Sequence, residues 1–126
     1  MKKYLLTGLL AVLFSVAGSM VSAHHSAAPF DFMSTVDVEG TVKKFRVMNP
    51  HSVIILEVTD SERGTRDIEF EGMSASTFYR AGYTKNSVLV GDTISINIAP
   101  RFTGEDGGFV MSFITSAGED IGFKGP

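Results

Sequence analysis

The feature that most restricts the fold is an alternation of apolar and polar residues, which recurs in several short segments after residue 35. The clearest case is the segment 93–98, where three isoleucines alternate with threonine, serine and asparagine. A period of two places one face of an extended segment in the core and the other in solvent, so it predicts a β-strand. Segments 52–58 and 68–71 show the same period, and 109–115 with 121–123 is expected to form a last hairpin. The sequence therefore predicts an all-β domain.

The first strand, which begins at Val36, carries a shift in this alternation. Its apolar residues occupy even positions as far as Val42 and odd positions from Phe45 onward. One extra residue at Lys43-Lys44 would restore a common face, and that is the effect of a β-bulge. We therefore expect all five apolar side chains in the core: Val36, Val38, Val42, Phe45 and Val47. The inward residues of the later strands should join them, namely Ile54, Leu56, Ile68, Phe70, Ile94, Ile96 and Ile98.

One short helix is expected between the third and fourth strands. Ser74 is a suitable N-cap for a helix over 75–81, and Gly82 stands where a left-handed residue commonly ends a helix. Phe78 would plug one end of a barrel. Three strands, a helix and two or three further strands are typical of an OB-fold, a small Greek-key barrel of five to six strands. A six-stranded up-and-down barrel is the alternative, and it accounts less well for the helix.

The first 23 residues have the pattern of a secretory signal peptide. Lys2 and Lys3 precede an apolar run, and Val21-Ser22-Ala23 has the small residues that signal peptidase accepts. The run is too short to favour a membrane span. We therefore predict a signal peptide at 1–23, an N-terminal arm at 24–34 and an OB-like barrel at 35–126. A cleaved signal peptide implies a periplasmic or secreted protein.

Charge and cysteine content exclude several classes of function. Residues 24–126 keep nine of the eleven basic residues and all fourteen acidic ones, a formal net charge of −5. Binding to nucleic acid or to anionic lipid needs a basic surface, so neither is expected as a partner. The chain has no cysteine, which excludes disulfides, thiolate chemistry and a lipid anchor on cysteine. A metal ion or a small ligand remains the expected partner.

The three histidines occur at two places only. His24 and His25 follow the predicted cleavage site, and His51 follows Asn49-Pro50 at the turn before the second strand. Cleavage after Ala23 makes His24 the N-terminal residue, whose α-amine and Nδ1 can chelate one metal ion. His51 would add a third nitrogen and complete a histidine brace, with His25 as an accessory ligand. Three nitrogen donors of this kind favour copper.

Simpler interpretations of the same residues stay open. The histidine pair can be a solvated tail, and His51 can be an ordinary turn residue that caps a strand end. Cleavage before Ala23 would instead give a site in which the third-position His25 binds copper or nickel without His51. Met48 is a candidate soft ligand for Cu(I), although a methionine near a turn more often fills a packing gap. The acidic residues Asp67, Glu69 and Glu71 are expected to form a solvated strand face.

Several motifs resemble a known family. They are His-His-Ser at 24–26, Gly-Thr-Val-x-x-Phe at 40–45, Asn-Pro-His at 49–51, Glu-Gly-x-Ser at 71–74, Tyr-Arg-x-Gly-Tyr-Thr at 79–84 and Val-Gly-Asp-Thr at 90–93. Together they resemble a widespread group of small exported bacterial proteins of unknown function. The resemblance implies an extracytoplasmic OB-like barrel and brings no established activity. Tyr83 departs from it, since tryptophan is common there in the family, and so does Ser52-Val53, which replaces a more aromatic pair.

These observations favour one function and leave a second open. The first is an exported β-barrel that binds, transports or buffers copper through His24 and His51. The second is a metal-free OB module that binds a small molecule, a glycan or a protein partner. Braced copper can activate oxygen, but the sequence shows no further acid–base set, so a binding protein is favoured over an enzyme.

Overall fold

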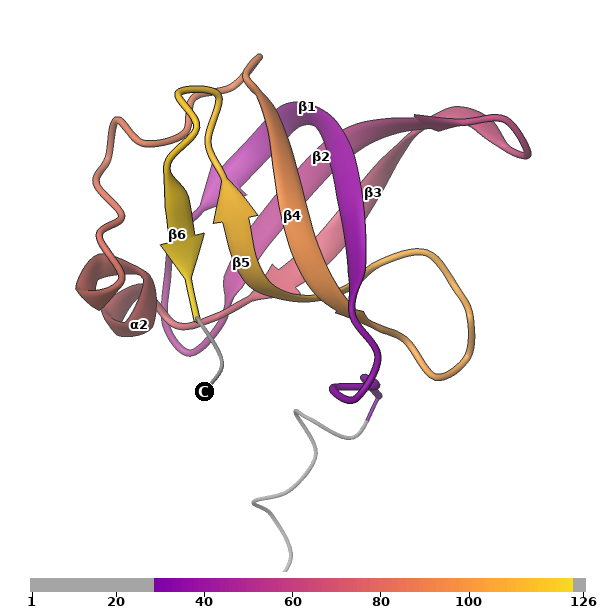
Figure 1. Ribbon diagram of the computed structural model, residues 1–126, viewed down its shortest axis with the longest axis horizontal. Coiled ribbons are helices and arrows are strands. Elements are labelled where there is room, and N and C mark those ends of the chain that lie inside the picture. Colours follow the sequence, from indigo (N-terminus) through magenta and orange to yellow (C-terminus); the bar gives the residue numbers. More distant parts are fainter. Residues whose placement is uncertain (1–28, 124–126) are drawn as a thin grey trace, which may run out of the picture.

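The computed structural model describes residues 29–123, which form a curved six-stranded sheet with one short helix (Figure 1). The elements follow the chain in this order: β1 (Val36–Arg46), β2 (Ser52–Asp60), β3 (Gly64–Gly72), α2 (Ala75–Arg80), β4 (Thr93–Pro100), β5 (Gly108–Ile114) and β6 (Asp120–Gly122). The helix follows β3 and precedes β4, as the sequence predicts. Within this part of the chain no helix is long and apolar enough to cross a membrane.

Strand pairing closes the first five strands into a barrel. The order in the sheet is β3-β2-β1-β4-β5-β6, and β3 also pairs with β5. That last pairing is parallel and short, with Glu71 opposite Phe109 and Gly72 opposite Val110. A closed five-stranded barrel in which β1 meets β4 and β3 meets β5, with a helix between β3 and β4, is the OB arrangement. The OB prediction is therefore confirmed. The up-and-down alternative is wrong, because β3 does not pair with β4.

The predicted bulge is present in β1. Val42 pairs with Leu56 and Lys44 with Ile55, so one residue of β1 has no partner in β2. As a result Val42 is fully buried, and Phe45 and Val47 are partly buried against the core. The expectation for Val36 is wrong, since it is 47% exposed. Pairing of β1 with β2 begins only at Thr41, so this first residue pairs with β4 alone and no second strand covers it.

Gly40 lets β1 bend closely against β2. A Cβ built on it would lie 2.7 Å from the carbonyl oxygen of Glu57 and 3.0 Å from the Cβ of Leu56. No side chain fits at that separation, so the contact requires glycine.

The apolar residues that were expected to point inward from the later strands are buried in the core. All seven expected residues are at most 6% exposed: Ile54, Leu56, Ile68, Phe70, Ile94, Ile96 and Ile98. Phe78 of α2 is fully buried at one end of the barrel, where its ring lies 5.6 Å from that of Phe113. Ser74 caps α2 by accepting a hydrogen bond from the backbone N–H of Thr77, and Gly82 has a φ of +103°. The helix prediction is therefore confirmed, with the last residue at Arg80.

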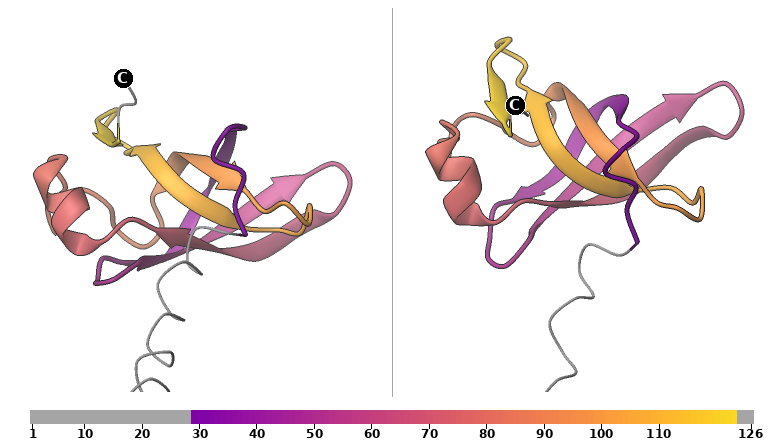
Figure 2. Two further views of the ribbon diagram at one scale, coloured as in Figure 1. Left: turned by 90° about the horizontal axis from the view of Figure 1, so that it is seen from below. Right: turned by 60° about the horizontal axis from the view of Figure 1, so that its bottom comes forward.

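The described part of the N-terminal arm is docked on the barrel. The N–H of Asp31 donates to the carbonyl of Pro100, and the N–H of Phe102 donates to that of Pro29. Phe30 forms an antiparallel bridge with Arg101 and is only 2% exposed. Figure 2 shows this indigo segment crossing β4 and β5 near the end of β4. An irregular sequence thus continues the sheet for a few residues beyond β4.

Candidate functional site

The turn that carries His51 is fixed by buried hydrogen bonds. Ser52, the first residue of β2, is fully buried, and its hydroxyl donates to the carbonyl of Met73 at 2.7 Å. The same hydroxyl accepts from the N–H of Met48 at 3.3 Å, and the carbonyl of Met48 accepts from Ala75. Asn49-Pro50 is a cis peptide. The turn before β2 is therefore tied to the connection between β3 and α2, which gives His51 a defined position.

His51 contacts a carboxylate and an aromatic ring. Its Nδ1 is paired with Oε1 of Glu71, which lies near the end of β3. The two side chains are each about one-third exposed. The edge of the pair is covered by Phe109, the second residue of β5, whose ring lies 5.8 Å from the imidazole at 90°. In a neutral imidazole whose Nδ1–H donates a hydrogen bond to Glu71, the free lone pair is on Nε2.

A groove of ≈ 350 Å³ opens beside this pair. Its lining comes from the turn before β2, from the start of β2, from the end of β3 and from the residue after β4: His51, Ser52, Val53, Glu69, Phe70, Glu71 and Arg101. OB barrels commonly bind ligands on the face of strands two and three, between the loop that follows strand one and the loop that follows strand four. By this analogy of fold, the groove occupies the usual ligand position.

The docked arm reaches the same region through a row of rings. The Phe30 ring lies 5.7 Å from that of Phe109, and the Phe109 ring lies 5.8 Å from that of His51. The guanidinium of Arg101 stands 5.3 Å from the Phe30 ring centroid. The arm thus approaches the His51 side of the barrel.

The other predicted ligands are placed only in part. His24 and His25 lie outside the described residues 29–123. Met48 is half-buried in the turn three residues before His51. Within the described residues no group of three His, Cys, Asp or Glu side chains is arranged to hold a metal ion. The three-nitrogen site therefore stays a prediction.

The sequence reasoning missed Glu71, Phe109 and Arg101 as site residues. Asp67 and Glu69 are exposed, as expected of a solvated face. Glu71 differs because it pairs with His51. A hairpin that turns at 60–64 places Ser52 opposite Gly72, so the register alone would have brought His51 to the end of β3. Phe109 and Arg101 gave no comparable signal. They come near His51 only when the barrel closes, and no local sequence pattern predicts that pairing of β3 with β5.

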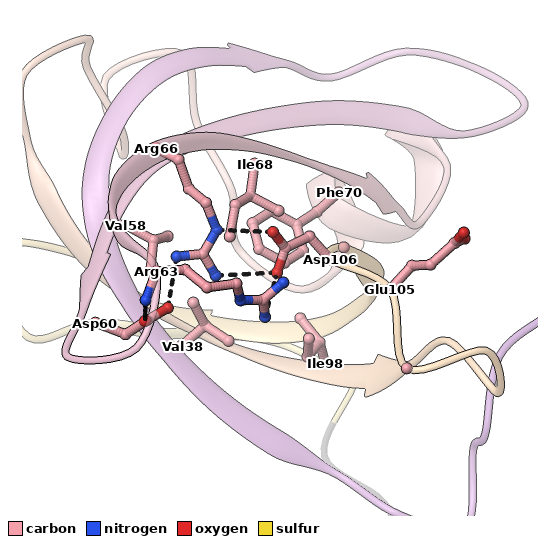
Figure 3. Close-up of a pocket in the computed structure, with 12 residues that line it drawn as sticks. Val38, Val58, Asp60, Arg63, Arg66, Ile68, Phe70, Ile98, Glu105 and Asp106 are labelled. Atoms are coloured by element: carbon pink, nitrogen blue, oxygen red, sulfur yellow. Dashed lines mark hydrogen bonds and ion pairs between the residues drawn. The ribbon is translucent and has the colours of Figure 1, made fainter.

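A second cavity, of ≈ 210 Å³, lies near the hairpin between β2 and β3 (Figure 3). Its floor is apolar, and Arg66 crosses it. The Arg66 guanidinium donates to both carboxylate oxygens of Asp106 at 2.7 and 3.0 Å and to Asp60 at 2.5 Å. Arg63 pairs with Asp106 at 2.9 Å. These four charges satisfy one another and tie the hairpin to the β4–β5 loop, which indicates a structural role.

The pKa values of this network follow from its hydrogen bonds. The pKa of Asp106 lies below its usual value, chiefly because Arg66 donates to it. The pKa of Asp60 is also lowered, first by the backbone N–H of Arg63 and then by Arg66. The same two carboxylates raise the pKa of Arg66.

Comparison with known proteins supplies a family and no functional precedent. A model of a family of unknown function matches residues 12–110. No curated protein and no solved structure matches the chain.

Proposed function

The chain belongs to DUF6152, a family of unknown function, and we propose that it is an exported, periplasmic protein that binds copper. The ligands in this proposal are Nε2 of His51 together with the α-amine and Nδ1 of His24, which becomes the N-terminus after cleavage behind Ala23. His25 serves as an accessory ligand. The role is copper binding, transport or buffering.

The contact between His51 and Glu71 is the observation that carries this proposal. Histidines that bind metals usually donate their other ring N–H to a carboxylate or carbonyl, which fixes the tautomer and raises ligand basicity. Glu71 makes this contact with Nδ1. It therefore prepares Nε2 of His51 as a nitrogen donor. A turn histidine without such a role needs no carboxylate partner.

The docked arm makes the proposed ligand pair geometrically attainable. Phe30 follows His24 by six positions, and an extended segment of that length spans about 20 Å. The Phe30 and His51 rings both lie within 6 Å of Phe109, so their separation is no more than the sum of those two distances. The reach of the segment exceeds that separation. His24 can therefore meet His51 without displacing Phe30.

Donor chemistry selects copper among the common metals. An amine and two imidazoles are three nitrogen donors, and Cu²⁺ heads the divalent affinity order for such sites. Met48 shares the turn with His51 and is the candidate thioether ligand for Cu(I). Of the described acidic residues, Glu71 contacts the imidazole, and it does so at Nδ1, away from the Nε2 that would face a metal ion. This favours a nitrogen site over an oxygen site for calcium or magnesium.

The test uses protein that has been exported and processed, with its N-terminus established by intact mass. One Cu²⁺ per chain should bind tightly. His51→Ala should weaken binding, and one residue added ahead of His24 should weaken it comparably, because the extension removes the amine from the chelate. Glu71→Gln should weaken binding about 10- to 100-fold, the usual loss for a residue that orients a ligand. Glu69→Gln, on the same face of β3, is the matched control and should bind copper normally.

Three results would count against the proposed site of His24 and His51. Equal affinity in the processed, extended and His51→Ala proteins would show that the histidines share no site. Binding that tolerates the extension but needs His51 would indicate an ordinary imidazole site. A mature N-terminus at Ala23 would favour the third-position His25 site instead.

A second candidate function is favoured by the groove itself. Its position on the β2–β3 face is the one that OB barrels use for ligands, which suits a metal-free module for a small molecule, a glycan or a protein partner. A saturating copper chelator should leave the binding of such a ligand intact and should abolish copper binding.

A further inference from the structure

Arg101 is the arginine of the His51 groove, and no anionic side chain of residues 29–123 pairs with it. It stacks on Phe30 and is half-buried. Among the described residues its guanidinium forms no ion pair or hydrogen bond, whereas Arg63 and Arg66 are both paired with Asp106. A guanidinium offers five donors in a planar fork that suits a carboxylate. Arg101 thus presents an unused carboxylate-binding group to the groove.

Glu69 is the matching anion of the groove. It points outward from β3, between the buried Ile68 and Phe70, and it has no partner in the described part of the chain. Its neighbour on the same face, Glu71, is already paired with His51. Glu69 is therefore the carboxylate of the groove that is available to a cation.

The two free charges lie close together without pairing. Gly107 lies between the backbone of Glu69 and the side chain of Arg101: a Cβ on this residue would be 2.7 Å from the carbonyl oxygen of Glu69 and 3.3 Å from Nε of Arg101. Both side chains line the same ≈ 350 Å³ groove. Arg101 and Glu69 nonetheless form no ion pair with each other. The groove thus presents one positive and one negative group side by side.

From this arrangement we propose that the groove binds a small zwitterion of the α-amino acid class. The carboxylate of the ligand lies against Arg101, and its ammonium lies against Glu69. Val53, which is half-buried on the outer face of β2, supplies an apolar contact for a ligand side chain. A simple anion is disfavoured because Glu69 and Glu71 line the same groove, and a simple cation is disfavoured by Arg101. Only a ligand with both charges pairs with both Arg101 and Glu69.

This inference goes beyond the copper proposal, since it uses neither His24 nor a metal, and it gives the metal-free candidate a ligand class. The experiment uses processed protein with a metal chelator present, so its outcome is independent of copper. L-leucine is the probe, with isocaproate as the analogue that lacks the ammonium and isoamylamine as the analogue that lacks the carboxylate. Binding is followed by chemical-shift changes of the backbone amides and of the Arg101 side chain.

Leucine should bind, and each analogue should bind at least about tenfold more weakly, as expected for the loss of one charge-assisted hydrogen bond. Arg101→Gln and Glu69→Gln should each weaken leucine binding by a similar factor. Arg80→Gln and Glu62→Gln change exposed residues of like charge outside the groove and should have no effect.

Three outcomes would overturn the proposal. The first is that neither leucine nor an equimolar mixture of the protein amino acids shifts the groove resonances. The second is that isocaproate binds as well as leucine, which would make Arg101 the centre of a simple anion site. The third is that leucine binds equally to the Arg101→Gln protein, which would place the contact elsewhere.

Discussion

Replacement of Phe30 by alanine tests whether the N-terminal arm is held by one side chain. Phe30 is 2% exposed and packs against Phe32, Phe109 and the guanidinium of Arg101. In the described part of the arm, from residue 29 onward, two backbone hydrogen bonds hold it to the strand end beside β4, those of Asp31 and Phe102. The ring is therefore the main apolar contact of the arm.

The size of the effect follows from burial. Truncation of a buried phenylalanine to alanine costs about 3–5 kcal/mol when the site cannot rearrange. Two backbone hydrogen bonds contribute about 1 kcal/mol each, so they cannot hold the arm against a loss of that size. The arm should detach while the barrel stays folded. The free energy of global unfolding should then fall only by the docking energy of the arm.

Amide hydrogen exchange distinguishes detachment of the arm from unfolding of the whole barrel. In Phe30→Ala the amides of Asp31 and Phe102 should exchange at least about 100-fold faster, since 3 kcal/mol corresponds to roughly that factor. The amide of Ile96, in the core of β4, should change much less. Phe32→Ala is the matched control, because Phe32 is 40% exposed and its loss should accelerate these amides far less.

Two results would refute this reasoning. Unchanged exchange at Asp31 and Phe102 would mean that the ring does not hold the arm. Equal acceleration at Ile96 would mean that arm and barrel unfold as one unit. If the arm detaches as expected, the copper proposal adds that Cu²⁺ affinity falls in Phe30→Ala, because His24 is then no longer held near His51.

Two further predictions concern buried polar contacts and pH. Ser52→Ala should lower the free energy of unfolding by about 1–3 kcal/mol in denaturant titrations, since the hydroxyl serves two backbone groups of the His51 turn; an unchanged midpoint would contradict this. The lowered pKa values of Asp60 and Asp106 stabilise the fold above their unfolded values near 3.8, and this stabilisation is lost as pH falls through the lower folded values. Asp106→Asn should therefore show a shallower loss of stability in acid, and parallel stability–pH curves for the two proteins would argue against that role.

Local patterns predicted most of the fold. The isoleucines of β4 alternate with a period of two, and a half-buried strand is the arrangement that buries all three. The bulge was visible as a change of parity between Val42 and Phe45, because side-chain direction along a strand has only two values. The cap at Ser74 is equally local. The OB order followed because these signals placed the helix between the third and fourth strands.

The errors arose where burial depends on a distant segment. Val36 has the same residue type as Val42, and its exposure reflects where β2 begins to pair with β1. Phe30 sits in a segment without period, yet it is buried because Arg101 and Phe109 lie beside it. The carboxylate of Glu71 looked like one of three solvated acids, and only the hairpin register distinguishes it. Phe109 and Arg101 belong to elements that are not joined to β2 by a hairpin, so no register in the sequence relates them to His51.

The short seam between β3 and β5 has a consequence for the order of folding. It joins residues 71–72 to 109–110 through two residue pairs only, whereas the other pairings join strands with longer registers. A long loop closed by few contacts loses chain entropy before it gains much stability, so we expect the seam to form late. Glu71 and Phe109 face each other across it, and both contact His51. A partly folded chain therefore lacks the site, and any ligand held between the two strands favours the closed barrel.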